Sequence, residues 1–352
     1  MNATPDEQLP AVSVIMPVLN EERHLRAAVS AILEQEYDGE MEVVVALGPS
    51  TDRTDEIAAE LVAETAGHRA RVQTVPNPTG RTPAALNAAI KASSHPIVVR
   101  VDGHGILSPG YIATAVRLLE ETGAQNVGGI MHAEGENDWE HAVAAAMTSK
   151  IGVGNAAFHT GGAAQQAETV YLGVFRRAAL EQQGGYNEEF IRAQDWELNF
   201  RIREAGGLIW FSPELKVQYR PRPSVKALAK QYKDYGRWRH VVARYHEGSI
   251  NLRYLAPPTA VCAIAAGVVV GALVTPWGFV VPAGYLAAIT AGSLPAGKGL
   301  PLKARLQIPV ALATMHMSWG WGFLTSPRSL AKKVIASRRP AVLDEVRGTS
   351  EV

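Results

Sequence analysis

Three segments of this chain combine residue types at spacings that could perform chemistry. The first is Asp102-Gly103-His104, where a carboxylate and an imidazole flank one glycine. Carboxylate oxygen suits Mg²⁺ or Mn²⁺, and imidazole favours Mn²⁺ of the two. Glycine between them allows close approach of backbone and ligand. The triplet therefore predicts a divalent-cation site that also holds a diphosphate, unless Asp102 only caps the turn Ser108-Pro109-Gly110.

The second segment is "FIRAQDWELNFRIREAGG", which contains Asp195. Leu198, Ile202 and Ala205 recur at helical spacing, so a helix is expected to begin close to Asp195. A carboxylate at that position is stabilised by the helix dipole. Asp195 is either a general base that faces a cleft or an exposed acid that caps the helix.

The third segment is "QYKDYGRWR", residues 231–239, in which aromatic and cationic side chains alternate. It could form a lid over a phosphate and a sugar ring, or an interfacial belt that anchors to lipid headgroups, or both. A weaker signal is Arg81 in "NPTGRTPAALNAAI", which could meet a phosphate before a helix or be an ordinary loop cation.

Alternating strands and helices are expected to position these groups. The predicted strands are Val12–Val18, Met41–Leu47, Arg71–Val75 and Pro96–Asp102, and helices are predicted at 21–35, from Ser50-Thr51-Asp52 to Glu64, and at 82–92. Unbroken apolar strands between helices indicate a mostly parallel sheet covered on both faces. Ligands bind at the carboxyl ends of such strands. The turns that hold Asn20-Glu21, Asp52 and Asp102 should therefore converge on one cleft. GxGxxG after the first strand and GxxxxGK[ST] are both absent, which disfavours a dinucleotide-binding oxidoreductase and a P-loop ATPase.

Composition limits the other classes. Lysine plus arginine equals aspartate plus glutamate at 34 each, so no basic field for nucleic acid is expected. The one cysteine, Cys262, excludes an intramolecular disulfide framework. The polar start "MNATPDEQLP" lacks the apolar core of a signal peptide, so the N-terminal part is expected in the cytoplasm.

The C-terminal part is expected to associate with a membrane. Residues 254–297 contain no charged side chain, which is enough for two spans of about 20 residues that break at Pro276-Trp277-Gly278. The alternative is a buried core of small residues. A third apolar run, 306–324, is weakened by Gln307, Pro309 and His316. Basic residues before Tyr254 indicate a cytoplasmic start. Three spans would place "RSLAKKVIASRR" outside, against the tendency of basic residues to lie on the cytoplasmic side. Either the third run lies in the interface or re-enters the membrane, or that tendency is not followed here.

These pieces occur in an order that resembles the family 2 glycosyltransferases, whose fold is called GT-A. The matching segments are "VSVIMPVLNEERHL", "STDRT", "NPTGRTPAALNAAI", "VVRVDGHG", "GVFRRAALEQQGGYNEEF", "QDWELNFRIREAGG" and "QYKDYGRWR", which cover about residues 12–246. The variant "RVDGHG" and the late aromatic-basic segment look most like the succinoglycan-type, membrane-associated glucosyltransferase branch. The implied domains are a polar tail at 1–11, a GT-A catalytic domain at 12–222, an amphipathic segment at 223–253, membrane helices at 254–325 and a basic, then polar tail at 326–352.

The resemblance also implies roles for individual residues. Asp195 matches the catalytic base. Asp102 matches the first acid of the family's DxD motif, and His104 replaces the second, so this pair would hold Mn²⁺ or Mg²⁺. The nucleotide sugar would contact Pro17, Asn20, Glu21, Asp52, Arg81, Asp102 and Gly103. The acceptor side and its lid would comprise Tyr186, Gln194, Trp196, Gln231, Arg237 and Trp238, the last three resembling a Q-x-x-R-W motif at longer spacing.

One departure concerns the base of the nucleotide. Many family members carry paired aspartates before the "STDRT" turn, whereas this chain has Leu47, Gly48 and Pro49. UDP as the carrier is therefore implied by the branch and not by these residues. Asp52 remains, and it resembles a helix cap as much as a nucleotide contact.

The implied reaction is an inverting transfer of a sugar, a hexose, to a lipid-linked saccharide at the cytoplasmic face of the membrane, for cell-envelope or extracellular polysaccharide synthesis. One alternative is a polyprenyl-phosphate sugar synthase of the same fold, which would use the lipid phosphate itself as acceptor. The other is a catalytically silent scaffold that binds nucleotide sugar or lipid, which the missing base-reading acid and the DxH variant motivate.

Overall fold

The computed structural model describes residues 9–336, so the ends of both predicted tails, 1–8 and 337–352, lie outside the described residues. Four parallel strands form the first half of the central sheet, in the order β3 (Ala70–Pro76), β2 (Met41–Leu47), β1 (Val12–Val18) and β4 (Ile97–Arg100). Their connecting helices are α1 (Leu25–Leu33), α2 (Thr54–Glu64) and α3 (Thr82–Ala92). The alternation expected from the sequence is confirmed here.

The second half of the sheet is mixed. From β4 the order continues through β8 (Tyr171–Arg176), β6 (Asn126–Ala133), β9 (Ile209–Tyr219) and β5 (Ile106–Leu107), with β7 (Gln165–Gln166) also on β9. Only β6 and β9 pair in parallel in this half. The register of β6 shifts near Gly129, where an added Cβ would lie 1.8 Å from the Leu215 carbonyl oxygen. The GT-A-like α/β fold is thus confirmed, with a mixed sheet where the sequence pattern predicted a mostly parallel one.

Helices bury both faces of the sheet. One core joins β1 residues such as Val14 and Met16 to α1, α2 and α4 (Tyr111–Thr122). The opposite core joins Ile15 to α3, α8 (Arg177–Gln182) and α9 (Gln194–Glu204). Because successive strand residues point to opposite faces, an apolar run without alternation serves both cores. Three further helices, α5 (Asp138–Met147), α6 (Lys150–Val153) and α7 (Ala157–Thr160), lead toward the C-terminal part.

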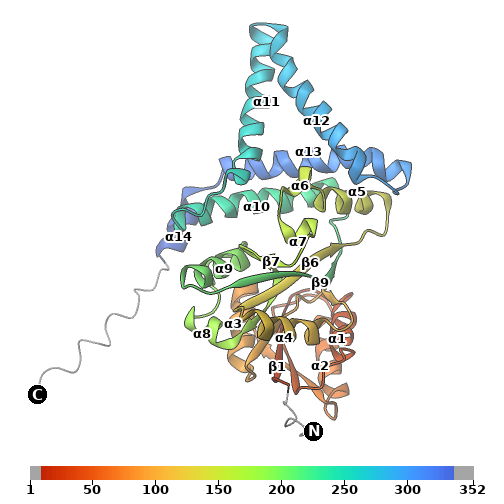
Figure 1. Cartoon of the computed structure of the whole chain (residues 1–352), viewed down its shortest axis with the longest axis vertical. Coiled ribbons are helices and arrows are strands. Elements are labelled where there is room, and N and C mark those ends of the chain that lie inside the picture. The colour runs from red at the N-terminus through yellow and green to blue at the C-terminus, as the bar shows by residue number, and fades with distance from the viewer. Residues whose placement is uncertain (1–8, 337–352) are drawn as a thin grey trace, which may run out of the picture.

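The C-terminal part consists of a helical platform and a projecting hairpin (Figure 1). Helices α10 (Val225–Tyr245) and α13 (Leu302–Leu324) lie side by side across the top of the catalytic domain. Their backbones approach closely, because a Cβ added to Gly236 would lie 1.9 Å from the Trp319 carbonyl oxygen. A short η1 (Leu252–Tyr254), then α11 (Ala256–Leu273), η2 (Pro276–Phe279) and α12 (Val280–Ala296) form the hairpin, and α14 (Arg328–Ala336) ends the described chain.

The hairpin is exposed, so the buried-core alternative for its apolar sequence is wrong. Leu252–Leu273 and Pro276–Ala296 are long and apolar enough to cross a membrane, with 22 and 21 residues. At about 1.5 Å per residue each matches a hydrocarbon core of about 30 Å. Leu273, Val274 and Trp277 at the tip are 78–79 % exposed. Helix α13 lies across the base of the hairpin rather than along it (Figure 1).

Candidate active site

Three turns at the carboxyl ends of the parallel strands are joined by hydrogen bonds. Asn20 follows β1 with a positive φ of 57°, and its side-chain oxygen accepts a bond from the Thr51 backbone NH at 2.8 Å. Asp52 accepts bonds from the backbone NH groups of Glu22 at 3.2 Å and Thr54 at 3.1 Å. Hydrogen bonds, chiefly from Thr54, lower the pKa of the exposed Asp52 carboxyl. Asp52 therefore ties the first loop to the start of α2 in this structure.

The acid Glu21, which follows β1, meets the imidazole of His104, which follows β4. Glu21 Oε1 lies 2.7 Å from His104 Nδ1, and this hydrogen bond raises the pKa of His104, while burial opposes the rise. Gly103 makes the approach possible, because a Cβ there would lie 3.0 Å from Glu21 Cγ and 3.2 Å from Val18 Cγ2. The first and fourth strands thus contribute paired groups to one site.

The guanidinium of Arg100 connects the two carboxylates singled out in the sequence. Arg100 is 2 % exposed at the end of β4, and its Nε and Nη2 both lie 3.0 Å from Asp102 Oδ1. Its Nη1 donates to Asp195 Oδ1. Asp102 and Asp195 therefore share one cation, although 93 positions separate them in the chain.

The surroundings of Arg100 shift the pKa values of the buried groups in this cluster. Burial lowers the pKa of Arg100, but its interactions with Asp102 and Tyr186 together outweigh burial and keep that pKa above its ordinary value. The ring of Tyr186 lies under the guanidinium, 5.9 Å from its central carbon, and burial raises the pKa of Tyr186. Burial and then Asp102 raise the pKa of Tyr171 well above its usual range. The phenols beside the site are therefore neutral hydrogen-bonding groups.

The residues around Asp102 suit a divalent cation of the Mn²⁺ or Mg²⁺ type. Residues 9–336 contain no cluster of three or more His, Cys, Asp or Glu side chains placed around a metal position. Both contacts of Asp102 with Arg100 use Oδ1, and Glu21 engages Nδ1 of His104. A carboxylate on one imidazole nitrogen orients the other toward a metal. Mg²⁺-like sites commonly use one or two protein ligands plus substrate phosphates, so Asp102 Oδ2 and His104 Nε2 fit such a site.

The residues near Asp195 have structural partners. Asp195 is the second residue of α9, whose first residue, Gln194, is buried. Trp196 stacks on the guanidinium of Arg239 from α10, 3.8 Å from its ring centroid, and the Tyr254 ring covers the other side at 3.7 Å. Burial lowers the pKa of Arg239 to about 10. This stack joins the start of α9 to the platform and to the foot of the hairpin.

The residues of the longer-spaced Q-x-x-R-W resemblance contact different parts of the structure from α10. Gln231 donates to the hydroxyls of Tyr219 at 2.8 Å and Tyr235 at 2.9 Å. Trp238 is 7 % exposed and packs on Phe190 at 6.1 Å between ring centroids. Arg237 is half-buried, with its Nη1 3.8 Å from Asp234. Only Gln231 is therefore joined to the end of β9, and the acceptor roles of all three stay predictions.

Three further predicted residues are Arg81, Pro17 and Tyr186. Arg81 precedes α3 and forms an ion pair with Glu189 at 3.3 Å. Pro17 is half-buried within β1. The side-chain amide of Asn87 accepts a hydrogen bond from the backbone NH of Tyr186 and donates one to its backbone carbonyl oxygen, both at 2.8 Å. Nucleotide or acceptor contacts for these residues also stay predictions.

Sequence reasoning missed Arg100, Tyr171 and Tyr219. Arg100 carried a usable signal, since it is the one charged residue in the four-residue strand Ile97–Arg100, all of which is buried. A buried cation requires an acidic partner, and Asp102 is two residues away. Tyr171 and Tyr219, whose rings lie 6.5 Å apart, belong to strands of the mixed half that the periodicity did not identify.

Comparison with known proteins identifies the family of this chain. Residues 13–183 match the family described as Glycosyl transferase family 2. The chain is 32 % identical over 316 residues to the succinoglycan biosynthesis protein ExoA of Rhizobium meliloti, covering 88 % of this chain and 93 % of that one. It is 24 % identical over 323 residues to a dolichyl N-acetyl-α-D-glucosaminyl phosphate 3-β-D-2,3-diacetamido-2,3-dideoxy-β-D-glucuronosyltransferase of Methanococcus voltae, covering 89 % and 95 %.

A solved structure shares the fold. The mannosyltransferase PcManGT of Pyrobaculum calidifontis, in complex with GDP-Man and Mn²⁺, superposes with a TM-score of 0.56 at 20 % identity, covering 95 % of this chain and 89 % of that one. The nucleotide sugar and the Mn²⁺ are properties of that complex.

Proposed function

We propose that this chain, which belongs to family 2 of the glycosyltransferases and is a glycosyltransferase of polysaccharide or glycan synthesis, is an inverting, cation-dependent hexosyltransferase. Its donor would be a nucleotide-diphosphate sugar, UDP-linked by analogy with the branch, and its acceptor a lipid-linked saccharide at the cytoplasmic membrane face. The observation that carries the proposal is the convergence of Asp102 and Asp195 on Arg100.

Asp195 is proposed to act as the general base. Its Oδ1 is engaged by Arg100, which leaves Oδ2 to accept the proton of an acceptor hydroxyl as that oxygen attacks the anomeric carbon. The bond from the anomeric carbon to the diphosphate breaks in the same step, so the configuration inverts and no covalent sugar-enzyme intermediate forms. Arg100 would hold the carboxylate in position through this contact.

The donor would lie against the loops that follow β1, β2 and β4. Asp102 and His104 would hold Mn²⁺ or Mg²⁺. When bound, this cation would neutralise negative charge on the diphosphate. Glu21 would then orient His104, which differs from the nucleoside contact that the family pattern implies for it. Arg81, at the start of α3, would lie on the phosphate side.

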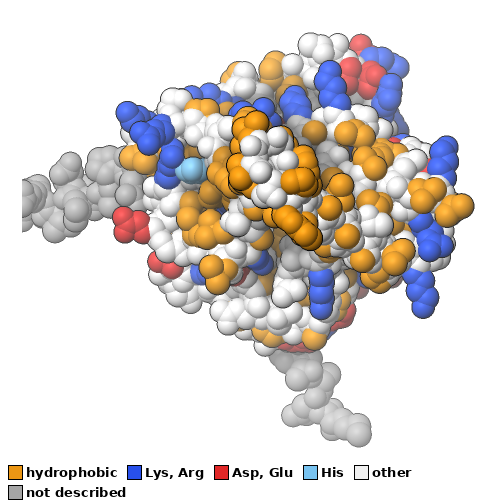
Figure 2. Space-filling model, turned by 90° about the horizontal axis from the view of Figure 1, so that it is seen from above, with side chains coloured by type: hydrophobic (Ala, Val, Ile, Leu, Met, Phe, Trp, Pro, Cys, Tyr) orange, Lys and Arg blue, Asp and Glu red, His pale blue; other side chains and the backbone are white. Residues whose placement is uncertain are grey.

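Membrane attachment is supported by the surface of the C-terminal part. The hairpin is apolar and exposed, and α13 carries the exposed side chains Leu302, Leu306, Val310 and Trp321. These positions fall within about 100° on a helical wheel at 100° per residue, while Ile308, Ala311 and Met315 face inward. Viewed along the hairpin, lysine and arginine side chains surround its apolar surface (Figure 2). We propose that α11 and α12 span the membrane and that α13 lies in the interface.

The lipid-linked acceptor follows from this placement. An acceptor anchored in the same membrane meets the cleft in a restricted orientation, which lowers the entropic cost of the encounter. The printed name of the Methanococcus voltae relative describes transfer to a dolichyl-linked sugar phosphate. A lipid-linked saccharide is therefore the acceptor class that both observations support.

The test is the variant Asp195→Asn in the purified full-length chain. Donor turnover with Mn²⁺ is measured as nucleotide release, and donor binding as a thermal shift with UDP-, GDP- and TDP-sugars, because a ligand that binds only the native state raises its melting temperature. We expect turnover to fall by about 10²–10⁴-fold, the usual contribution of a general base, with the thermal shift retained.

The matched control is Asp55→Asn. Asp55 is the second residue of α2, as Asp195 is of α9, and it is exposed. The Asp55→Asn variant should lose only the interaction of the carboxylate with the helix dipole and should keep wild-type turnover. Normal turnover by Asp195→Asn would contradict the assignment of the base.

A further inference from the structure

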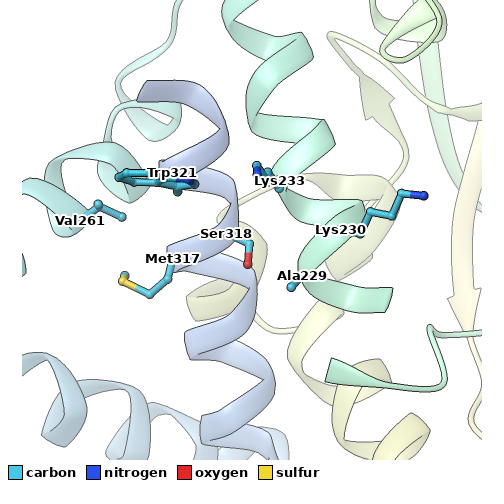
Figure 3. A pocket seen from close by; sticks show the side chains of 7 residues that line it. All are labelled: Ala229, Lys230, Lys233, Val261, Met317, Ser318 and Trp321. Atoms are coloured by element: carbon cyan, nitrogen blue, oxygen red, sulfur yellow. The ribbon is translucent and has the colours of Figure 1, made fainter. Parts of the chain in front are cut away.

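A groove opens where α10, α13 and the foot of α11 meet (Figure 3). It has a volume of about 430 Å³ and is lined by Ala229, Lys230, Lys233, Val261, Met317, Ser318 and Trp321. The groove is open to solvent in this structure, and it lies on the platform rather than in the cleft that contains Asp195.

The two walls of the groove differ in chemistry. Lys230 and Lys233 come from α10, while Val261, Met317 and Trp321 come from α11 and α13 (Figure 3). Neither lysine forms an ion pair anywhere in the described part of the chain. The lining is almost entirely apolar, and the side chain of Lys230 runs away from α13 (Figure 3), so the charged ends of the lysines lie at the rim of the groove. An apolar groove with cations at its rim is complementary to an amphipathic anion, whose charged group would meet the rim and whose hydrocarbon would lie in the groove.

The groove belongs to the membrane-facing surface. Val261 lies in the candidate span Leu252–Leu273, about one turn above the start of α11. Trp321 is 53 % exposed and continues the apolar stripe of α13. A headgroup seated on Lys230 and Lys233 could therefore extend its chains along Val261 and Trp321 into the hydrocarbon region without crossing a polar surface.

We propose that this groove binds the phosphate headgroup of an anionic phospholipid, with Lys230 and Lys233 on the phosphate and the acyl chains on Val261, Met317 and Trp321. The inference rests on the membrane attachment within the proposed function, but not on the transfer reaction. Each lysine near a membrane surface adds to the attraction for anionic lipid.

The direction of the lysines favours a phospholipid over the sugar acceptor. At 100° per residue, Lys230 and Lys233 project from α10 about 100–160° away from Gln231 and Tyr235. Those two residues face the end of β9, where Gln231 meets Tyr219. A saccharide attached to a phosphate in the groove would have to pass around α10 to reach Asp195, whereas a phospholipid has no such requirement.

The experiment measures lipid binding by native mass spectrometry of the purified full-length chain in detergent, titrated with phosphatidylglycerol or phosphatidylcholine. We expect selective binding of phosphatidylglycerol, and an affinity about 30-fold weaker in the double variant Lys230→Gln and Lys233→Gln. That factor is about 2 kcal/mol at 1.4 kcal/mol per tenfold. Ala229→Trp keeps both lysines and fills the groove, so it should lose the lipid as well.

The charge-matched control is the double variant Lys226→Gln and Lys298→Gln. Both lysines are exposed near the platform and lie outside the groove, so binding should persist. Equal loss in the control would show diffuse surface attraction and overturn the site. Displacement of phosphatidylglycerol by undecaprenyl diphosphate would also overturn it, by assigning the groove to a polyprenyl acceptor. Donor hydrolysis in the same preparations tests the proposed reaction separately, because the groove variants leave Asp195 and Asp102 intact.

Discussion

Replacement of Arg100 by lysine tests whether the shared cation organises the site. The guanidinium presents a planar set of donors, of which Nε and Nη2 contact Asp102 and Nη1 contacts Asp195. A lysine retains the charge but has one ammonium on a flexible chain, so it cannot hold both carboxylates in this arrangement. At least one charge-assisted hydrogen bond is lost, and such bonds are worth about 1.5–3 kcal/mol.

The expected result is a fall in kcat/KM for donor turnover of about 10- to 100-fold, since 1.4 kcal/mol corresponds to a factor of ten. The assay is nucleotide release by the purified full-length chain with Mn²⁺. If Arg100 acts through Asp195, the double variant Arg100→Lys and Asp195→Asn should be little worse than Asp195→Asn alone, because residues that act as a unit are not additive.

Arg177→Lys is the matched control for loss of a partly buried arginine. Arg177 donates to the carbonyl oxygens of His95 and Ile90 and to the Ser93 hydroxyl, so its loss should lower the melting temperature and leave kcat/KM unchanged. Equal effects of the two substitutions on turnover, or wild-type turnover by Arg100→Lys, would refute the role of Arg100 in the site.

Three further predictions concern Glu21, Glu197 and Gly322. Glu21→Gln should weaken Mn²⁺ activation of donor hydrolysis about 10- to 100-fold, as for other groups that orient a metal-binding imidazole; an unchanged Mn²⁺ titration would contradict the pairing with His104. Glu197→Gln should lower the free energy of unfolding by about 3 kcal/mol. Burial raises the pKa of Glu197, but hydrogen bonds, first from His246, lower that pKa overall. Thermal melts should therefore show the full difference in stability at pH 7 and a smaller difference as the pH falls below about 4. Gly322→Ala should lower the melting temperature, because its Cβ would lie 2.0 Å from the Lys233 carbonyl oxygen and overpacking costs about 1–3 kcal/mol; an unchanged melt would show that α10 and α13 can separate.

The parallel half of the fold was predictable because its signals are local. Three of the four strands between Val12 and Arg100 are largely apolar, whereas β3 at the edge of the sheet contains polar residues and is partly exposed, and each helix between them has its own periodicity. The parallel-sheet rule then places the following turns at one edge. The hydrogen bond between Asn20 and Thr51 and the pairing of Glu21 with His104 are consequences of that rule.

The mixed half was not predictable in the same way. The two-residue strands β5 and β7 are too short to show a period, and the pairing of β8 between β4 and β6 depends on contacts between residues far apart in the chain. The partner of Asp195 is one of these long-range results. Its helix position was visible in the sequence, but its contact with Arg100 requires the second half of the sheet to bring α9 to the end of β4.

The proposed topology, with α13 in the interface, would remove the difficulty over charge that three spans create. With two spans, α10 and α14 lie on the same side of the membrane, and the basic residues of 223–253 and the described part of "RSLAKKVIASRR" share that side, as the positive-inside tendency requires. Polar residues within the third apolar run are compatible with this placement, because an interfacial helix needs only one apolar face toward lipid. His316 accordingly bonds the Ile151 carbonyl oxygen at 2.9 Å on the side of α13 that faces the catalytic domain. One helix, α10, carries Gln231 toward the end of β9 and Lys233 toward the groove. In the proposed topology this helix would set the position of the domain that holds Asp195 relative to the membrane.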